Sequence, residues 1–193
     1  RKHLSKPAIS VIGCGTLFAS FALSIWVFLQ VKSGNVHTAH YFDFINVGKL
    51  KIPFAFKIDQ LSSLFLLIIT GVGSFIHVYS TSYMQEEKAE HFGRYFSYLN
   101  LFIFSMLLLV MGANFVVMFI GWEGVGLCSY LLIGFWFKKN EYNKAASKAF
   151  IMNRIGDLAF LIAIFWLITK LSTVSFDEIF TAASLEKLST VDI

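Results

Sequence analysis

Charged residues are scarce in this sequence. Asp, Glu, Lys and Arg make up only 15% of its 193 residues, whereas 56% are hydrophobic and 22 are Phe. Soluble domains carry about 25% charged residues and about 45–50% apolar ones. A single soluble core of this size cannot hide such an apolar surplus. The composition therefore excludes an ordinary soluble domain and favours a protein that lies in lipid.

Residues that commonly hold a cofactor are also few. The two cysteines, Cys14 and Cys128, lie in different apolar stretches, which excludes a disulfide framework and an iron–sulfur cluster. No paired histidines at helical spacing indicate haem, and the glycines of residues 121–126 lack a phosphate-binding lysine. We therefore expect no cofactor and no metal ion in this chain. The net charge of +4 does not indicate nucleic acid, because the basic residues lie between apolar stretches.

Five apolar stretches are long enough to cross a bilayer, which takes about 20 residues with a rise of about 1.5 Å each. They are residues 8–31, 58–83, 95–111, 115–137 and 147–170. The pattern predicts an all-α, polytopic transmembrane helical bundle. We divide the chain into a first span with a polar loop (1–57), a core of four spans (58–170) and a polar tail (171–193), with a short surface helix expected near 176–180.

Positive charge is unevenly distributed between the two ends of the predicted spans. The side that shares the N-terminus is richer in Lys and Arg, including Lys88, Arg94, Lys138 and Lys139. These residues lie on short loops, where positive charge has the strongest influence on orientation. The sequence thus predicts that the N-terminus faces the cytoplasm.

Three acidic or basic residues other than histidine fall well inside predicted spans: Glu123, Arg154 and Asp157. Each costs about 2.5–3.5 kcal/mol at the bilayer centre, so a protein that keeps them needs a reason. Arg154 and Asp157 are three residues apart and share a helix face, so they can pair. Two interpretations of this pair stay open, a neutralised structural couple and part of a proton relay.

Glu123 has no such partner on its own helix. Gly121, Gly124 and Gly126 surround it; glycines weaken a helix but let neighbouring backbones approach closely. We therefore expect Glu123 to face the bundle interior. A carboxyl balanced between burial and a nearby cation can take up and release a proton near neutral pH, as a relay requires. The alternative is a permanently protonated Glu that only hydrogen-bonds between helices.

His77 and Lys148 are further candidates. His77 lies in the second predicted span and histidine titrates near pH 7, although a lone histidine in a helix is more often a satisfied structural group. Lys148 either reaches inward at the start of the fifth span or extends to the lipid headgroups. We expect the four tryptophans to pack and to anchor the spans at the membrane surface, not to take part in chemistry.

The residues around Glu123 resemble a known family. The stretch GWEGVGLCSYLLIGFW (residues 121–136) is similar to the antiporter-like membrane subunit of proton-pumping NADH:quinone oxidoreductase, respiratory complex I, of the type called subunit L in bacteria and subunit 5 in mitochondria. Residues 58–84, 94–124 and 148–160 (KAFIMNRIGDLAF) agree with this family in order and spacing. The likeness joins a glycine-framed glutamate to an Arg-x-x-Asp on the next span.

This resemblance implies an antiporter-like fold with inverted repeats of five transmembrane helices, in a subunit with more spans than these five. It implies that Glu123 is the family's essential glutamate, paired with a lysine on a later, broken helix. Arg154 and Asp157 match residues that tune the relay, and His77 matches a family histidine. Because the chain stops before that lysine, we expect it to be part of a longer protein.

The implied function is proton translocation driven by quinone reduction elsewhere in the complex, with Glu123, Asp157, Arg154, Lys148 and His77 as site residues. The implied partners are the other membrane subunits of complex I and the lipid of the bacterial plasma membrane or mitochondrial inner membrane. NADH and quinone would bind other subunits. Two alternatives stay open: a subunit of a multi-subunit cation/proton antiporter, and a purely structural membrane-arm subunit.

Overall fold

The computed structural model describes residues 5–48 and 50–181. Five long helices dominate it: α1 (Lys6–Val31), α2 (Gln60–Tyr83), α3 (Ala89–Met111), α4 (Phe115–Ile133) and α5 (Asn140–Leu171). Each is long and apolar enough to cross a membrane. The predicted bundle of about five spans is therefore confirmed, and the expected short helix is present as α6 (Phe176–Ile179). The tail beyond residue 181 lies outside the described residues.

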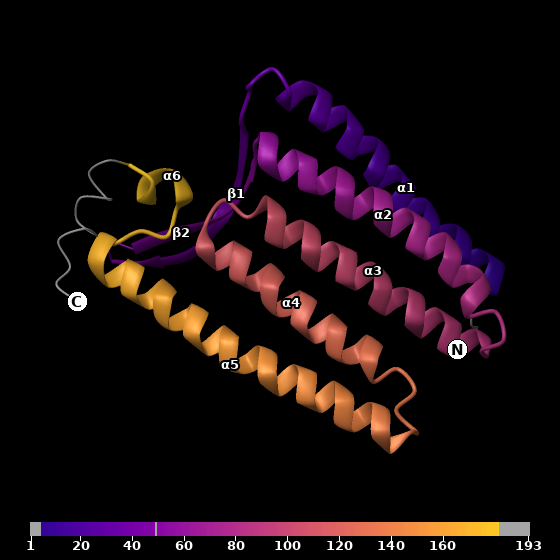
Figure 1. Ribbon diagram of the computed structural model, residues 1–193. Coiled ribbons are helices and arrows are strands. Elements are labelled where there is room, and N and C mark those ends of the chain that lie inside the picture. The colour runs from indigo at the N-terminus through magenta and orange to yellow at the C-terminus, as the bar shows by residue number, and fades with distance from the viewer. Residues whose placement is uncertain (1–4, 49, 182–193) are drawn as a thin grey trace.

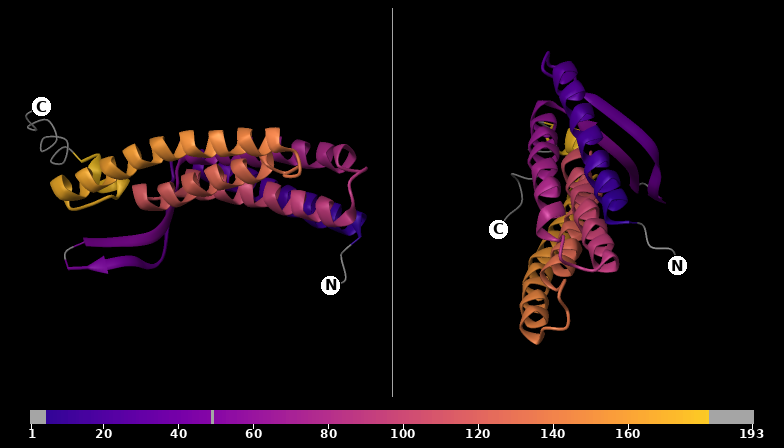
Figure 2. Two further views of the ribbon diagram at one scale, coloured as in Figure 1. Left: turned by 90° about the horizontal axis from the view of Figure 1, so that it is seen from below. Right: turned by 90° about the vertical axis from the view of Figure 1, so that its right-hand side faces the viewer.

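The helices lie side by side in the order of the sequence, each antiparallel to the one before it (Figure 1). α1, α2 and α3 pack against one another as a group of three, α3 also packs against α4, and α4 packs against α5. Figure 2 shows the result as an elongated bundle, with the N-terminus at one end and α6 at the other. This order makes α4 the element that connects the group of three to α5.

The segment of residues 32–57 is not the polar loop that we predicted. Most of it forms an antiparallel hairpin of two strands, β1 (His37–Val47) and β2 (Leu50–Ile58). Apolar residues alternate with others along most of β2, as in a strand, and Gly48 turns the chain with a φ of 59°. Ile52 and Ala55 of β2 are buried, so this strand packs on the helix ends. The prediction was wrong because the alternation in residues 50–58 was overlooked.

Three helix ends differ from the predicted spans by more than two residues. α3 begins at Ala89 instead of Tyr95, α5 begins at Asn140 instead of Ser147, and α4 ends at Ile133 instead of Phe137. Hydropathy marks only the part of a helix that matches the hydrocarbon, whereas α3 and α5 continue through polar residues at their starts. α4 stops before Gly134, a residue type that weakens helices.

Asn114 fixes the start of α4. Its side chain accepts hydrogen bonds from the backbone N–H groups of Val116 and Val117, at 3.1 and 2.9 Å. The same side chain donates a hydrogen bond of 2.8 Å to the carbonyl of Pro53 in β2. Asn114 is buried, so it both caps the helix and ties it to the hairpin without leaving polar groups unpaired.

Two glycines set how closely α4 lies on α3. A Cβ atom added to Gly121 would come within 2.4 Å of the Leu109 backbone nitrogen, and one added to Gly124 within 2.5 Å of the Ser105 hydroxyl oxygen. Neither position has room for a side chain, so the close backbone approach predicted at these glycines is confirmed. The side of α4 that packs on α3 is therefore formed by glycines, and larger side chains lie on the side that packs on α5.

We expect Gly121→Ala to destabilise the protein by about 1–3 kcal/mol, because overpacking against a backbone atom forces α3 and α4 apart. Gly15→Ala is the matched control, since it adds the same methyl group to another spanning helix at a position with nothing within 4 Å. The melting temperature of the full-length protein in lipid nanodiscs measures both changes. Equal melting temperatures for the two variants would contradict the close α3–α4 contact.

Asp59 immediately precedes α2 and caps it. Its carboxylate accepts a hydrogen bond from the Ser62 N–H, and the Ser62 hydroxyl accepts one from the Asp59 N–H, both at 2.8 Å. Burial raises the pKa of Asp59, but hydrogen bonding by Ser62 and the charge of Lys57 outweigh it, so the pKa lies below its ordinary value of 3.8. A lowered folded-state pKa stabilises the fold above the unfolded value, and the contribution is lost as pH falls through the folded value.

Asp59→Ala should therefore cost about 0.5–2 kcal/mol at neutral pH, the usual cost of losing an N-cap. Asp59→Asn keeps a capping oxygen and should cost less, because it removes only the charge. The stability difference between wild type and Asp59→Asn should shrink as the pH falls from about 7 to about 3. Melting temperatures across this range measure it, and a difference that stays constant would show that the carboxylate charge does not stabilise the cap.

Candidate functional site

Three charges from α4 and α5 meet near the middle of both helices. Arg154 of α5 bonds Oε2 of Glu123 on α4, and the same guanidinium nitrogen lies 3.6 Å from Oδ2 of Asp157. The Arg154–Asp157 pair predicted from residue spacing is confirmed. Arg154 is in addition the partner that Glu123 lacks on its own helix. One cation therefore contacts two carboxylates, one of them across a helix–helix interface.

Asp157 is the most enclosed of the three. Its side chain is 8% exposed, against 24% for Glu123 and 39% for Arg154. The indole N–H of Trp122 donates a hydrogen bond of 2.7 Å to Oδ1 of Asp157, and the Trp122 ring packs edge-on against Phe160. Each oxygen of Asp157 thus has its own partner, which fixes the orientation of the carboxylate.

An aromatic ring also supports the guanidinium. The Arg154 Cζ atom lies 4.6 Å from the centroid of the Phe150 ring, one turn earlier in α5. A cation over the face of an aromatic ring is attracted by the ring quadrupole, more strongly where water is excluded. Phe150 therefore holds Arg154 at the level of the two acids.

A groove of about 620 Å³ opens beside this cluster, between α3, α4 and α5. Asp157, Trp122 and Asn153 contribute polar groups to its wall, and most of the remaining lining is apolar. A space of this size with polar partners can hold water molecules. Asp157 therefore lies in the wall of this groove, beside Trp122 and Asn153.

The cluster carries one negative charge in excess, since Glu123 and Asp157 contribute two negative charges and Arg154 one positive. Arginine does not release its proton in proteins, so only the two carboxylates can exchange one. Uptake of a single proton makes the cluster neutral, and an uncompensated charge inside a membrane is costly. The arrangement is thus suited to binding and releasing one proton.

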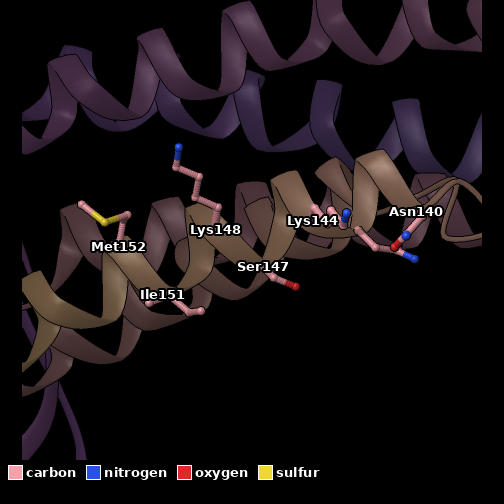
Figure 3. A pocket seen from close by; sticks show the side chains of 7 residues that line it. Asn140, Lys144, Ser147, Lys148, Ile151 and Met152 are labelled. Carbon is pink, nitrogen blue, oxygen red and sulfur yellow. The ribbon is translucent and has the colours of Figure 1, made fainter.

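Lys148 and His77 lie apart from this cluster. Lys148 lines a pocket of about 490 Å³ along the first part of α5, together with Lys144, Ser147 and Met152 (Figure 3). In this view Lys148 and Ser147 point in opposite directions from the helix. None of the ion pairs in the described part of the chain includes Lys148. His77 is fully buried in α2, which packs against α1 and α3.

The role of Trp122 was missed from the sequence. We expected it only to pack or to anchor; it does pack against Phe160, and its hydrogen bond to Asp157 was not foreseen. The indole of Trp136 donates to Glu87 at an exposed site, at 2.9 Å. The sequence did contain a signal for this bond. Hydrocarbon supplies no acceptor for an indole N–H, and Glu123, the next residue, points to a different side of the helix, so the acceptor had to come from another helix.

No metal centre is formed by the side chains described. Within residues 5–48 and 50–181, no group of three or more His, Cys, Asp or Glu is arranged to hold an ion. The Glu123–Arg154–Asp157 cluster is instead an ion-paired group of one cation and two carboxylates.

Two family descriptions match successive parts of the chain. "NADH-Ubiquinone oxidoreductase (complex I), chain 5 N-terminus" matches residues 44–96, and "NADH:quinone oxidoreductase/Mrp antiporter, TM" matches residues 112–191. NADH-quinone oxidoreductase subunit L of Mycobacterium tuberculosis (strain H37Rv) is 42% identical over 190 residues, which are 95% of this chain and 30% of that protein. Subunit L of Campylobacter jejuni is 44% identical over 179 residues, 92% of this chain and 28% of that protein.

Two solved assemblies contain chains with the same fold. A chain of the Mrp complex from Dietzia sp. DQ12-45-1b superposes with a TM-score of 0.77 at 22% identity, over 92% of this chain and 19% of that one. A chain of the membrane-bound sulfane sulfur reductase, an archaeal respiratory membrane complex, gives a TM-score of 0.66 at 21% identity, over 88% and 26%. At these identities the two superpositions show the fold alone.

The fold and the charged cluster define an integral membrane protein of the antiporter-like class. The chain belongs to the antiporter-like membrane subunits of NADH:quinone oxidoreductase, complex I, and the relatives named above are its subunit L. The chain spans about 30% of the length of these relatives. Members of this family lie in the bacterial plasma membrane or the mitochondrial inner membrane.

Trp122→Phe should lower stability by about 1.5–3 kcal/mol, because it keeps the aromatic packing and removes a hydrogen bond to a nearly buried carboxylate. Trp136→Phe removes the corresponding bond to Glu87 at an exposed site and should cost about 1 kcal/mol or less. Thermal unfolding of the full-length protein in nanodiscs compares the two. A larger loss for Trp136→Phe would contradict the role assigned to Trp122.

Proposed function

We propose that this chain is part of a proton-translocating membrane subunit of NADH:quinone oxidoreductase. The observation that carries the proposal is the shared cation: Arg154 contacts Glu123 and Asp157 at once, inside two apolar spans. The match to subunit L relatives supports the same parent enzyme. The chain performs no redox chemistry of its own in this proposal. NADH and quinone react on other subunits, and quinone reduction there drives the protons.

In the proposed mechanism the two carboxylates carry the proton and Arg154 responds to it. A proton that reaches Glu123 cancels its charge, so the guanidinium pairs with Asp157 alone, which already lies 3.6 Å away. Loss of the proton restores the attraction to Glu123. This exchange requires only a small movement of Arg154. The position of the guanidinium therefore depends on which acid is ionised and changes the electrostatic field at the other acid.

Lys148 is assigned to the end of the path nearer the start of α5, which is the predicted cytoplasmic side. It lies six residues before Arg154 in the same helix, where it lines its own pocket with Lys144. A positive charge at this place would oppose the arrival of other cations while the acids are neutral, and would stabilise the acids when they are ionised. Its role is thus electrostatic.

The second candidate function is a subunit of a cation/proton antiporter. The family description that matches residues 112–191 favours it, because that description names the Mrp antiporter beside NADH:quinone oxidoreductase. A purely structural subunit is the third. Two observations separate these candidates. A parent complex that oxidises NADH and reduces quinone supports the first candidate against the antiporter. Loss of pumping when Glu123 is neutralised supports either of these against a scaffold.

The decisive variant is Glu123→Gln in the full-length protein within its complex. It keeps the size of the side chain and one oxygen that can accept a hydrogen bond from Arg154, and it removes the exchangeable proton. We expect proton translocation by the complex in liposomes to fall by about a hundredfold or more, the lower end of what a group that transfers a proton contributes. The complex should still assemble, because Arg154 retains Asp157.

Glu141→Gln is the matched control, since Glu141 is an exposed acid at the start of α5. It should leave pumping unchanged. If Glu123→Gln also pumped protons at the wild-type rate in an assembled complex, the relay would be refuted and the scaffold interpretation would stand.

A further inference from the structure

His77 is completely buried, at 0% exposure, although the cluster on α4 and α5 does not use it. It lies where α1, α2 and α3 pack together, and its ring meets Phe96 of α3 edge-on with centroids 6.0 Å apart. The glycines of this interface are tightly covered: a Cβ atom on Gly73 would meet Ile103 at 2.9 Å, and one on Gly13 would meet Phe96 at 2.8 Å. Within the described residues the imidazole ring is therefore closed off from the molecular surface.

The hydrogen bonding of His77 defines its tautomer. Nδ1 lies 2.8 Å from the carbonyl oxygen of Gly73, and a carbonyl only accepts, so Nδ1–H is the donor. In the neutral ring Nε2 is then a bare acceptor. Nε2 is buried, and no protein group in the described part of the chain lies within hydrogen-bonding distance of it. Buried polar atoms are nearly always paired, so this acceptor needs a partner.

Other polar groups on the buried side of α2 do not raise this question. The Thr70 hydroxyl donates to the Leu66 carbonyl at 2.6 Å, and the Ser74 hydroxyl donates to the Thr70 carbonyl at 2.7 Å. Bonds of this kind to the preceding turn are the usual state of Ser and Thr in membrane helices. The Thr70 and Ser74 hydroxyls thus find partners within their own helix, whereas Nε2 of His77 has none among the described residues.

A source of further hydrogen bonds lies one helical turn after His77. The hydroxyl oxygens of Ser80 on α2 and Tyr95 on α3 are 3.3 Å apart. The two groups have two hydroxyl hydrogens between them, and their mutual bond uses one. The other is available to a molecule that lies in the same interface.

We propose that the α1–α2–α3 interface holds a buried water molecule that donates a hydrogen bond to Nε2 of His77, and that this hydrated histidine is a second proton-accepting site, separate from the acids of α4 and α5. Buried waters commonly make about three hydrogen bonds to groups that would otherwise be unpaired. The water passes a proton to Nε2 and takes one from a hydronium ion that arrives through solvent; the hydronium is left as water, so the bound water is regenerated. The ring becomes imidazolium and keeps its Nδ1–H bond to Gly73 throughout. The inference rests on the proposed function, because a proton-accepting site has a role only in a protein that moves protons.

A map of the intact complex in lipid, at a resolution that shows ordered water, tests the first half. We expect a solvent peak about 2.7–3.2 Å from Nε2 of His77. We expect that peak to be lost in His77→Leu and kept in His77→Gln, whose amide can still bond the water. No solvent at Nε2 in the wild-type map would overturn the proposal.

The number of protons moved per NADH oxidised, measured in liposomes, tests the second half. We expect this number to fall in both His77→Leu and His77→Gln, because neither side chain accepts a proton, while NADH oxidation continues. The Gln variant keeps the test decisive if the Leu variant fails to assemble. Ser74→Ala is the control on the same helix, and it should keep the wild-type proton number.

Wild-type proton numbers in the assembled His77→Gln complex would overturn the inference even if the water were seen. This failure can be told apart from a failure of the proposed function. If Glu123→Gln abolishes pumping and His77→Gln does not, only the second site is wrong. If neither variant affects pumping, the proposed function itself is wrong.

Discussion

The contact between Arg154 and two carboxylates is the interaction on which the rest of this arrangement depends. An ionised side chain in hydrocarbon costs several kcal/mol unless it is paired. Glu123 and Asp157 lie in the apolar middle part of two candidate spans, so α4 and α5 keep them side by side, with the guanidinium in contact with both. The same ion pairs therefore hold α4 against α5 and form the charged site.

The position of α4 follows from the different demands on its two sides. Toward α3 it has glycines at 121 and 124, where a side chain would overlap neighbouring atoms. Toward α5 it has Trp122 and Glu123, both of which bond residues of that helix. Because α4 approaches α3 so closely, its polar side chains are held at a constant distance from the group of three helices. A less restrained α4 would not present two adjacent residues to two different partners.

Features of the fold and of the site could be predicted from the sequence where they depend on residues that are close together in the chain. The five spans follow from runs of apolar residues, and the Arg154–Asp157 pair follows from a spacing of three residues on one helix. The Arg154–Glu123 and Trp122–Asp157 contacts were missed because they depend on how two helices are rotated about their axes, which hydropathy does not encode. The hairpin was missed for another reason, since its alternation was present in residues 50–58 and composition was given more weight.

Lys148 and His77 show the limit of assignment by residue type. Both are titratable residues in or near spans, and the sequence placed them in the same relay as Glu123. The structure separates them: Lys148 lies in a pocket lined by residues of α5, and His77 lies in another group of helices. A residue type suggests what chemistry is available, but the helix on which it lies and the side that it faces decide where this chemistry can be used.

The geometry also determines which ion pair responds to a movement of the helices. Arg154 and Asp157 share α5, so the rigid helix sets their separation and a shift of α5 against α4 leaves it nearly unchanged. Arg154 and Glu123 belong to different helices, so the same shift changes their separation directly. Trp122 limits such a shift, because its bond to Asp157 crosses the same interface one residue away from Glu123. The counter-charge available to Glu123 is thus controlled by helix packing, whereas that of Asp157 is built into its own helix. A relay needs this difference, because two acids that always experienced the same field would have no reason to hold a proton one after the other.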